Sequence, residues 1–113
     1  MPHIILEYSE SLDGPIDMEC LLGALHDSLA AQGIEKARIK TRGVPVAHAF
    51  VGEKGKAGTM MHATLLLLEG RDIATKKQLG DALHGVLKKA SAKSPVCAVT
   101  LEIRDMVKDT YYM

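Results

Sequence analysis

The order strand–helix–strand, which occurs twice along the chain, constrains the fold more than any other feature of the sequence. Hydrophobic periodicity and turn residues indicate, in chain order, a strand over His3–Tyr8, a helix over Asp17–Gln32, a strand over Ala37–Arg42, a strand-like segment over Val46–Val51, a strand over Met60–Glu69, a helix over Ile73–Ala92 and a strand over Val96–Arg104. The two strands of each unit pair in parallel through a right-handed crossover. The sequence therefore predicts a two-layer α+β fold, in which a four-stranded sheet carries two helices on one face.

The two halves of the chain also share a pattern of residues. At an offset of 58 positions the two helices carry the same letters, namely Leu21, Ala24, Leu25, His26 and Leu29 against Leu79, Ala82, Leu83, His84 and Leu87. A chain of 113 residues builds one domain of ordinary size. We therefore expect a single domain, residues 1–113, made of two similar halves of about 1–58 and 59–113.

An uninterrupted run of four leucines, residues 65–68, predicts a strand that is buried on both faces. Two helices cover only one face of a four-stranded sheet. Leaving several hundred Å² of apolar sheet in water forgoes on the order of 10 kcal/mol, at about 25 cal/mol per Å². We therefore expect other copies of the same chain to cover the helix-free face.

The charge balance argues against a nucleic-acid partner. Lysine and arginine together number 14, as do aspartate and glutamate, so the formal net charge is zero, whereas nucleic-acid-binding domains are basic. The apolar run at residues 4–6 is too short for a signal segment or a membrane span. Cys20 and Cys97 form no CxxC pair and lie among apolar residues, so we expect them to be reduced core residues. These features favour a cytoplasmic protein with no membrane partner.

The histidines do not have the spacing of metal ligands. The chain contains His3, His26, His48, His62 and His84, but no HxH, no HExxH and no closely spaced Cys/His pair. We expect His26 and His84 to be solvated on their helices, and His48 and His62 to occupy core or interface positions on strands. The sequence also lacks a phosphate-binding loop and a GxSxG nucleophile motif. It therefore favours chemistry without a metal or a cofactor.

Three cations stand at or near predicted strand ends. Lys40 and Arg42 alternate on one strand and so point to the same side, and Arg71 follows Gly70 where the leucine-rich strand ends. Most such cations form ordinary salt bridges or belong to a solvated surface. The alternative is a binding site for a multiply charged carboxylate, in which the cations also stabilise an enolate.

Pro2 lies directly before the first predicted strand, and two interpretations of it are open. Proline is tolerated at the first position of a strand because its missing N–H has no ladder partner to lose. Alternatively, removal of the initiator methionine would expose the secondary amine of Pro2. An amine in apolar surroundings has a lowered pKa and can act as a general base.

Several segments together resemble the 5-carboxymethyl-2-hydroxymuconate isomerase branch of the tautomerase superfamily. They are MPHIILEYS at the N-terminus, LAAQGI at the end of the first helix, and IKTR, HATL and GRDIATKKQLGDALHGVL further along. The resemblance extends from Pro2 to about Ile103. Its most specific elements are the proline directly after the initiator methionine and the Gly-Arg pair before the second helix.

The resemblance implies two βαβ units in each subunit of a homotrimer and a cofactor-independent isomerase of aromatic compound catabolism. In that family the N-terminal proline moves a proton on an unsaturated 2-hydroxy or 2-oxo di- or tricarboxylate. Pro2 would then be the general base, and the carboxylate substrate would be bound by His3, Lys40, Arg42 and Arg71.

The chain departs from the family's pattern where Lys40 replaces the first arginine of an Arg-x-Arg strand. Lysine supplies a charge but no bidentate fork. The segment GVPVAHAFV replaces an aromatic-rich stretch, and the chain contains no tryptophan. An alternative to the isomerase is therefore a non-catalytic tautomerase-fold oligomer that binds a small carboxylate or a protein partner.

Overall fold

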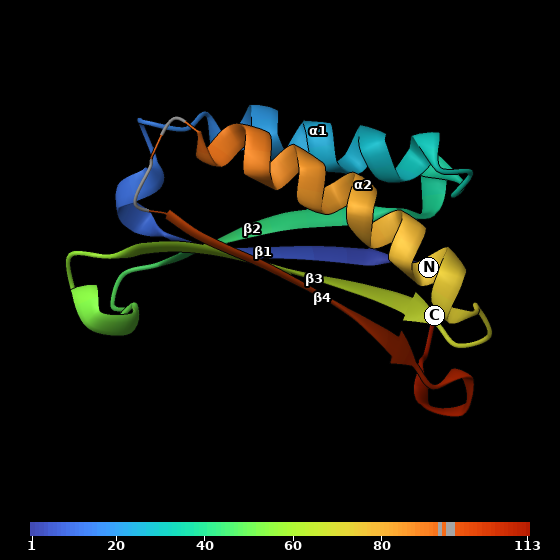
Figure 1. Cartoon of the computed structure of the whole chain (residues 1–113). Coiled ribbons are helices and arrows are strands. Elements are labelled where there is room, and N and C mark those ends of the chain that lie inside the picture. The colour runs from blue at the N-terminus through green and yellow to red at the C-terminus, as the bar shows by residue number, and fades with distance from the viewer. Residues whose placement is uncertain (93, 95–96) are drawn as a thin grey trace.

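The computed structural model describes residues 1–92, 94 and 97–113, and it has two helices packed on one face of a four-stranded sheet (Figure 1). The strands are β1 (His3–Ser9), β2 (Lys40–Val46), β3 (Thr59–Leu68) and β4 (Cys97–Met106), and the helices are α1 (Met18–Ala31) and α2 (Ile73–Ser91). Short 3-10 helices occupy Glu10–Leu12, Lys36–Arg38, Gly52–Lys54 and Lys108–Thr110. This architecture confirms the predicted two-layer α+β fold.

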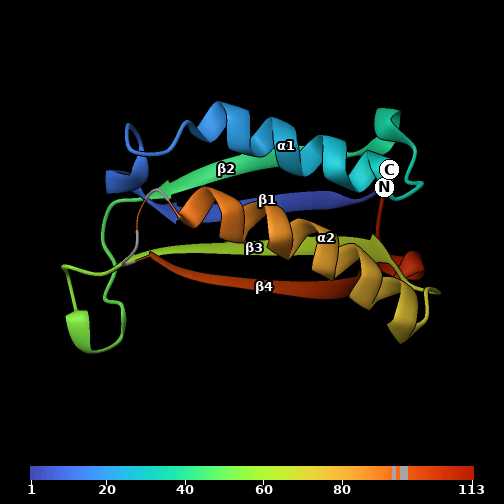
Figure 2. The same ribbon diagram turned by 45° about the horizontal axis from the view of Figure 1, so that its top comes forward.

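The sheet has the strand order β2-β1-β3-β4. β1 pairs with β2 in parallel and β3 pairs with β4 in parallel, whereas the central pair β1 and β3 is antiparallel. The start of β1 therefore lies beside the start of β2 and the end of β3, with His3 opposite Lys40 on one side and Leu66 on the other. Figure 2 shows α1 and α2 lying over the sheet and the two chain ends close together.

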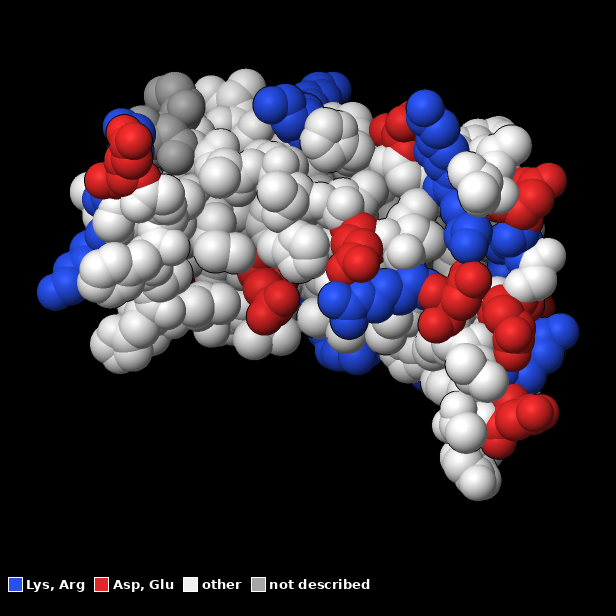
Figure 3. Space-filling view, turned by 60° about the horizontal axis from the view of Figure 1, so that its bottom comes forward, with Lys and Arg blue, Asp and Glu red and all other residues white. Residues whose placement is uncertain are grey.

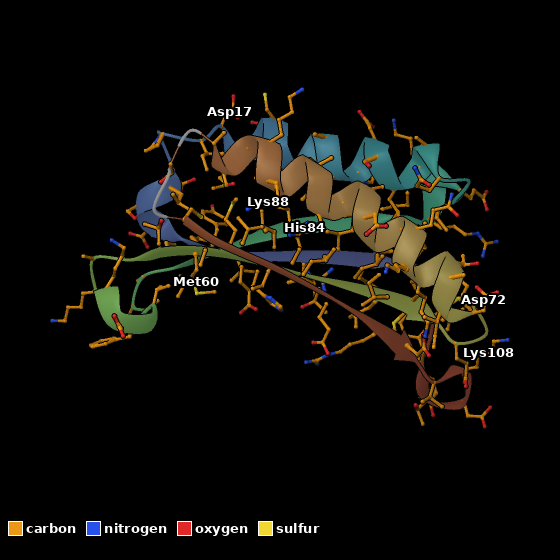
Figure 4. All side chains as sticks on the ribbon, in the orientation of Figure 1. Asp17, Met60, Asp72, His84, Lys88 and Lys108 are labelled. Atoms are coloured by element: carbon orange, nitrogen blue, oxygen red, sulfur yellow. The ribbon has the colours of Figure 1, made fainter. Side chains whose placement is uncertain are left out.

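An aspartate stands directly before each helix and caps a backbone N–H group of its first turn. The carboxylate of Asp17 accepts from the Cys20 N–H at 3.0 Å, and that of Asp72 accepts from the Thr75 N–H at 2.8 Å. Figure 4 shows the two aspartates at the starts of their helices. The first helix ends one residue before Gln32, and Gly33 follows with φ 94°, a conformation that glycine adopts without strain.

The core lies between the helices and the sheet, and β3 alternates between the two faces of the sheet. Leu65 and Leu67 are at most 1% exposed and pack beneath the helices. Leu66 and Leu68 point to the helix-free face and are half-buried. Only every second leucine of the run therefore belongs to the helix-free face, because successive side chains of a strand point to opposite sides.

The segment after α1 differs from the sequence prediction. Lys36–Arg38 forms a 3-10 turn, and strand β2 begins only at Lys40 and continues through Pro45 to Val46. Pro45 is accommodated because β2 is an edge strand, where a residue without an N–H loses no ladder partner.

Other predictions for single residues are corrected by the structure. Residues 47–50 form a loop with a bend at residues 47–48 rather than a strand, so His48 is exposed. Cys20 is exposed on α1 rather than buried in the core. The predicted start of the last strand, Val96, lies outside the described residues. Over the described residues, no helix is long and apolar enough to cross a membrane.

Candidate functional site

A cavity of about 290 Å³ opens at the end of the sheet where β1 begins. Its lining comes from four places in the chain: the N-terminus, the turn after α1, the 3-10 turn before β2 and the junction between β3 and α2. The lining residues are Met1, Pro2, Gly33, Ile34, Glu35, Arg38, Leu68 and Arg71. The antiparallel pairing of β1 with β3 explains this juxtaposition, because it places the end of β3 beside the first residues of the chain.

Pro2 is held firmly at this cavity. Its side chain is buried, and its carbonyl oxygen accepts a hydrogen bond from the Lys40 N–H at 3.1 Å. This bond extends the parallel ladder between β1 and β2 by one residue beyond His3. Pro2 therefore has a fixed place next to the cavity.

Positive charge surrounds the amino terminus. Burial lowers the pKa of the Met1 amine below its usual value, and the cations Arg38, Arg71 and Lys40 lower that pKa further. The carboxylate of Glu35 opposes them by raising the pKa. An amine in this position therefore favours its neutral form more than an ordinary α-amine does.

The two arginines of the cavity differ in their partners. The Nε of Arg38 contacts a carboxylate oxygen of Glu35 at 2.8 Å, and both side chains are largely exposed. Arg71 has no carboxylate partner among the residues that the structure describes. The Arg71 guanidinium is therefore available to a bound anion.

Arg38 was missed by the sequence analysis. The prediction of a strand from Ala37 put the alternating pair Lys40 and Arg42 on one side and gave Arg38 no separate role. The 3-10 turn at Lys36–Arg38 instead turns Arg38 toward the cavity. The stretch ARIKTR does carry a signal, since it contains a third cation two residues before Lys40.

A second group of polar residues lies on the helix-free face of the sheet, next to the same strand start. Arg42 contacts Nδ1 of His3 through its Nη1 at 3.1 Å, and Nε2 of His3 lies 2.8 Å from the hydroxyl oxygen of Tyr111. Burial lowers the pKa of His3, as do the nearby charges of Arg42, Lys40 and the amino terminus. Figure 3 shows basic and acidic side chains next to one another on this side of the molecule.

The residues that the sequence analysis selected thus fall into two neighbouring groups. Pro2 and Arg71 line the cavity, whereas His3 and Arg42 contact one another on the helix-free face. Lys40 adjoins both groups, because its N–H donates to the Pro2 carbonyl and it stands opposite His3 in the strand pairing. Its charge lowers the pKa of both the amino terminus and His3. Within the described part of the chain, no three His, Cys, Asp or Glu side chains gather as metal ligands would.

Comparisons with known proteins show which family the chain resembles. A family model described as 5-carboxymethyl-2-hydroxymuconate isomerase matches residues 2–113. The chain is 28% identical over 110 residues to the 5-carboxymethyl-2-hydroxymuconate Delta-isomerase of Escherichia coli. The matched region covers 94% of this chain and 87% of that protein. A crystal structure of a 5-carboxymethyl-2-hydroxymuconate isomerase from Deinococcus radiodurans R1 superposes with a TM-score of 0.90 at 25% identity, over 99% of this chain and 87% of that one.

A more distant likeness concerns the fold alone. A symmetric trimer described as a fused wild-type 4-OT superposes with a TM-score of 0.71 at 24% identity, over 98% of this chain and 90% of that one. With the family match over nearly the whole chain, these findings decide the assignment. The chain belongs to the 5-carboxymethyl-2-hydroxymuconate isomerase family of the tautomerase superfamily and is an isomerase.

Proposed function

We propose that Pro2, exposed by removal of Met1, is the general base that moves a proton on an unsaturated 2-hydroxy di- or tricarboxylate. The neutral amine takes the proton of the 2-hydroxyl group, and the electrons shift along the conjugated chain to give a 2-oxo group. The same amine then returns the proton to a carbon of that chain. One O–H bond is lost and one C–H bond is formed, so no cofactor is needed for the balance.

The observation that carries this proposal is the setting of the amino terminus at the cavity. A base at pH 7 has to be neutral, and a free secondary amine is more basic than an ordinary α-amine, whose pKa is about 7.7–8.0. Burial and the charges of Arg38, Arg71 and Lys40 lower the pKa of the Met1 amine, one residue before Pro2. We infer that they act on the Pro2 amine in the same direction once it becomes the terminus.

The same cations suit the substrate. A dienolate carries negative charge on oxygen, and guanidinium groups fixed beside the reacting atoms stabilise it without reorganisation. Arg71 is free to form two parallel hydrogen bonds with a carboxylate. Arg38 adds a second guanidinium group at the cavity, two residues before the lysine at position 40 where the resembling family has arginine; its Nε contacts Glu35, so we propose that it binds a carboxylate through its terminal nitrogens.

Assembly into a homotrimer completes the proposal. The helix-free face of a single chain carries the half-buried side chains of Leu66 and Leu68, and neither helix covers it. The fused 4-OT neighbour is a symmetric trimer. Light scattering should give three times the 12.2 kDa mass of the chain. Because muconates are products of aromatic ring cleavage, we also place the reaction in the breakdown of aromatic compounds and the substrate among small carboxylates.

The test uses the protein with Met1 removed, verified by mass spectrometry, and 2-hydroxymuconate as substrate. The decay of dienol absorbance should be fast for this protein and slower by about 10²- to 10⁴-fold for the same protein with Met1 retained, because an amide nitrogen cannot act as a base. Pro2→Ala should also lose activity. Equal rates with and without Met1 would show that the terminal amine is not the base.

A further inference from the structure

A chain of hydrogen bonds links the C-terminal tail to Arg42 through His3. The hydroxyl of Tyr111 lies 2.8 Å from Nε2 of His3, and Nδ1 of His3 lies 3.1 Å from Nη1 of Arg42. The rings of His3 and Tyr111 also meet edge to face, with centroids 5.9 Å apart and planes at 78°. Two residues separated by 108 positions are therefore in direct contact at the start of β1.

The donors and acceptors along this chain are fixed by chemistry. A guanidinium group can only donate, so Nδ1 of His3 accepts from Arg42 and carries no proton. The proton of neutral His3 then resides on Nε2 and is donated to the oxygen of Tyr111. The hydroxyl proton of Tyr111 remains free to point outward.

The tail is held in place by contacts other than that with His3. After β4 ends, the N–H of Lys108 donates to a carboxylate oxygen of Glu69 at 2.7 Å, and the N–H of Thr110 donates to the Val107 carbonyl at 3.1 Å. These bonds return the chain toward the N-terminus, as the adjacent end labels in Figure 1 show. Tyr111 is thereby half-buried against His3, whereas Tyr112 is 89% exposed.

Arg42 has the features of a ligand for an anion that the described residues of its own chain do not supply. It has no carboxylate partner among the described residues, although Arg38 and Arg104 each have one. Lys40 lies two residues away on the same face of the edge strand β2, so two positive charges stand together. A bound carboxylate would relieve this repulsion.

We propose that Tyr111 is a positioning residue that acts through His3 to hold Arg42 for a second carboxylate of the substrate, distant from the reacting end. This inference rests on the proposed function, in which the first carboxylate lies at the cavity with Arg71. It assigns the specificity for substrates with two or more carboxylates to a hydrogen-bond chain that begins in the tail. Tyr111 itself does not take part in the proton transfer.

The first test is spectroscopic and needs no substrate. Nitrogen-15 NMR of the ring of His3 should show the neutral Nε2–H form in the intact protein at pH 7.5. Tyr111→Phe removes the acceptor of that proton and should move the Nε2 resonance, whereas Tyr112→Phe should leave it unchanged. A dominant Nδ1–H form in the intact protein would overturn the proposal, whatever the fate of the proposed reaction.

The second test compares 2-hydroxymuconate with 2-hydroxy-2,4-pentadienoate, which has the same dienol but lacks the distal carboxylate. Tyr111→Phe should raise KM for the dicarboxylate by about three- to tenfold with kcat within about twofold, and leave the monocarboxylate unaffected. In an Arg42→Gln background the same substitution should have no further effect. An equal effect on both substrates, or in both backgrounds, would refute a role through Arg42. If the protein without Met1 turned over neither substrate, that result would count against the proposed function and not against the role of Tyr111, which the NMR measurement tests separately.

Discussion

Replacing Arg38 or Arg71 with glutamine should move the acidic limb of the pH profile of kcat/KM to higher pH. That limb reports the ionisation of the free enzyme's essential base, which we propose to be the Pro2 amine. A positive charge nearby disfavours the protonated amine and lowers its pKa. Removing the charge therefore raises the pKa of the amine, and activity appears only at higher pH.

The size of the shift follows from the cavity. The two guanidinium groups line the same cavity as the amine, so a separation on the order of 8 Å sets the scale of the interaction. At 8 Å two unit charges interact by about 0.5 kcal/mol in water and about 2 kcal/mol at an effective dielectric constant of 20. Because 1.36 kcal/mol corresponds to one pKa unit, each substitution should raise the limb by about 0.4–1.5 units.

The assay measures kcat/KM for 2-hydroxymuconate between pH 5 and 9 with protein that lacks Met1. Glu35→Gln is the control of opposite sign, because the carboxylate of Glu35 raises the pKa of the amino terminus and its removal should lower the limb. Arg42→Gln should move the limb less than Arg71→Gln, since Arg42 contacts His3 rather than the cavity. His3→Gln tests whether a histidine produces the limb instead.

Two results would refute this reasoning. A limb that stays in place in Arg38→Gln and Arg71→Gln would show that these cations do not act on the catalytic base. A limb that disappears in His3→Gln but is unchanged in the arginine variants would identify His3 as the base in place of Pro2.

Three further predictions follow from named contacts. Arg71→Ala should lower kcat/KM more than Lys40→Ala, because a guanidinium group grips a carboxylate with two hydrogen bonds and an ammonium group does not; equal losses would contradict this ranking. The pKa of His3 is lowered in the folded state, so the unfolded chain binds more protons than the folded protein as the pH falls below about 6.5. Between pH 7.5 and 5.5 the intact protein should therefore lose more thermal stability than the His3→Gln variant. Identical losses would show that His3 does not contribute to this pH dependence. Leu65→Ala should lower the free energy of unfolding by about 2–5 kcal/mol, as judged by urea unfolding, because Leu65 is fully buried beneath the helices; a loss below about 1 kcal/mol would contradict this packing.

Most of the fold could be predicted because it depends on local signals. Helical periodicity located α1 and α2, and the repeated strand–helix–strand order predicted the parallel pairs. Periodicity could not locate the start of β2, since an alternating stretch such as Ala37–Arg42 fits both a strand and a 3-10 turn followed by a strand. The leucine run at residues 65–68 concealed the alternation of β3 because every position in it is apolar.

The candidate site was harder to predict, since it depends on which chain ends the topology brings together. The antiparallel pairing of β1 with β3 places Arg71 beside Pro2, and no local pattern in the sequence gives that pairing. The return of the tail to His3 depends on a single hydrogen bond from Lys108 to Glu69 and a short turn. Tyr111 therefore had no signal in the sequence beyond its presence in a short polar tail.

The 3-10 turn before β2 changes which residue can bind a carboxylate with two hydrogen bonds, and it therefore changes the role that lysine needs to have at position 40. If position 40 had to provide the bidentate fork, lysine there would weaken carboxylate binding, because an ammonium group has no planar pair of donors. The structure instead places the fork of Arg38 on the cavity wall, two residues earlier, and leaves Lys40 between the cavity and the His3–Arg42 pair. A compact charge that lowers the pKa of both the amino terminus and His3 suits that intermediate position. Arg38→Gln alone should weaken carboxylate binding. The double substitution Arg38→Gln, Lys40→Arg should recover only part of that affinity, because its new guanidinium group stands on β2 and not on the cavity wall.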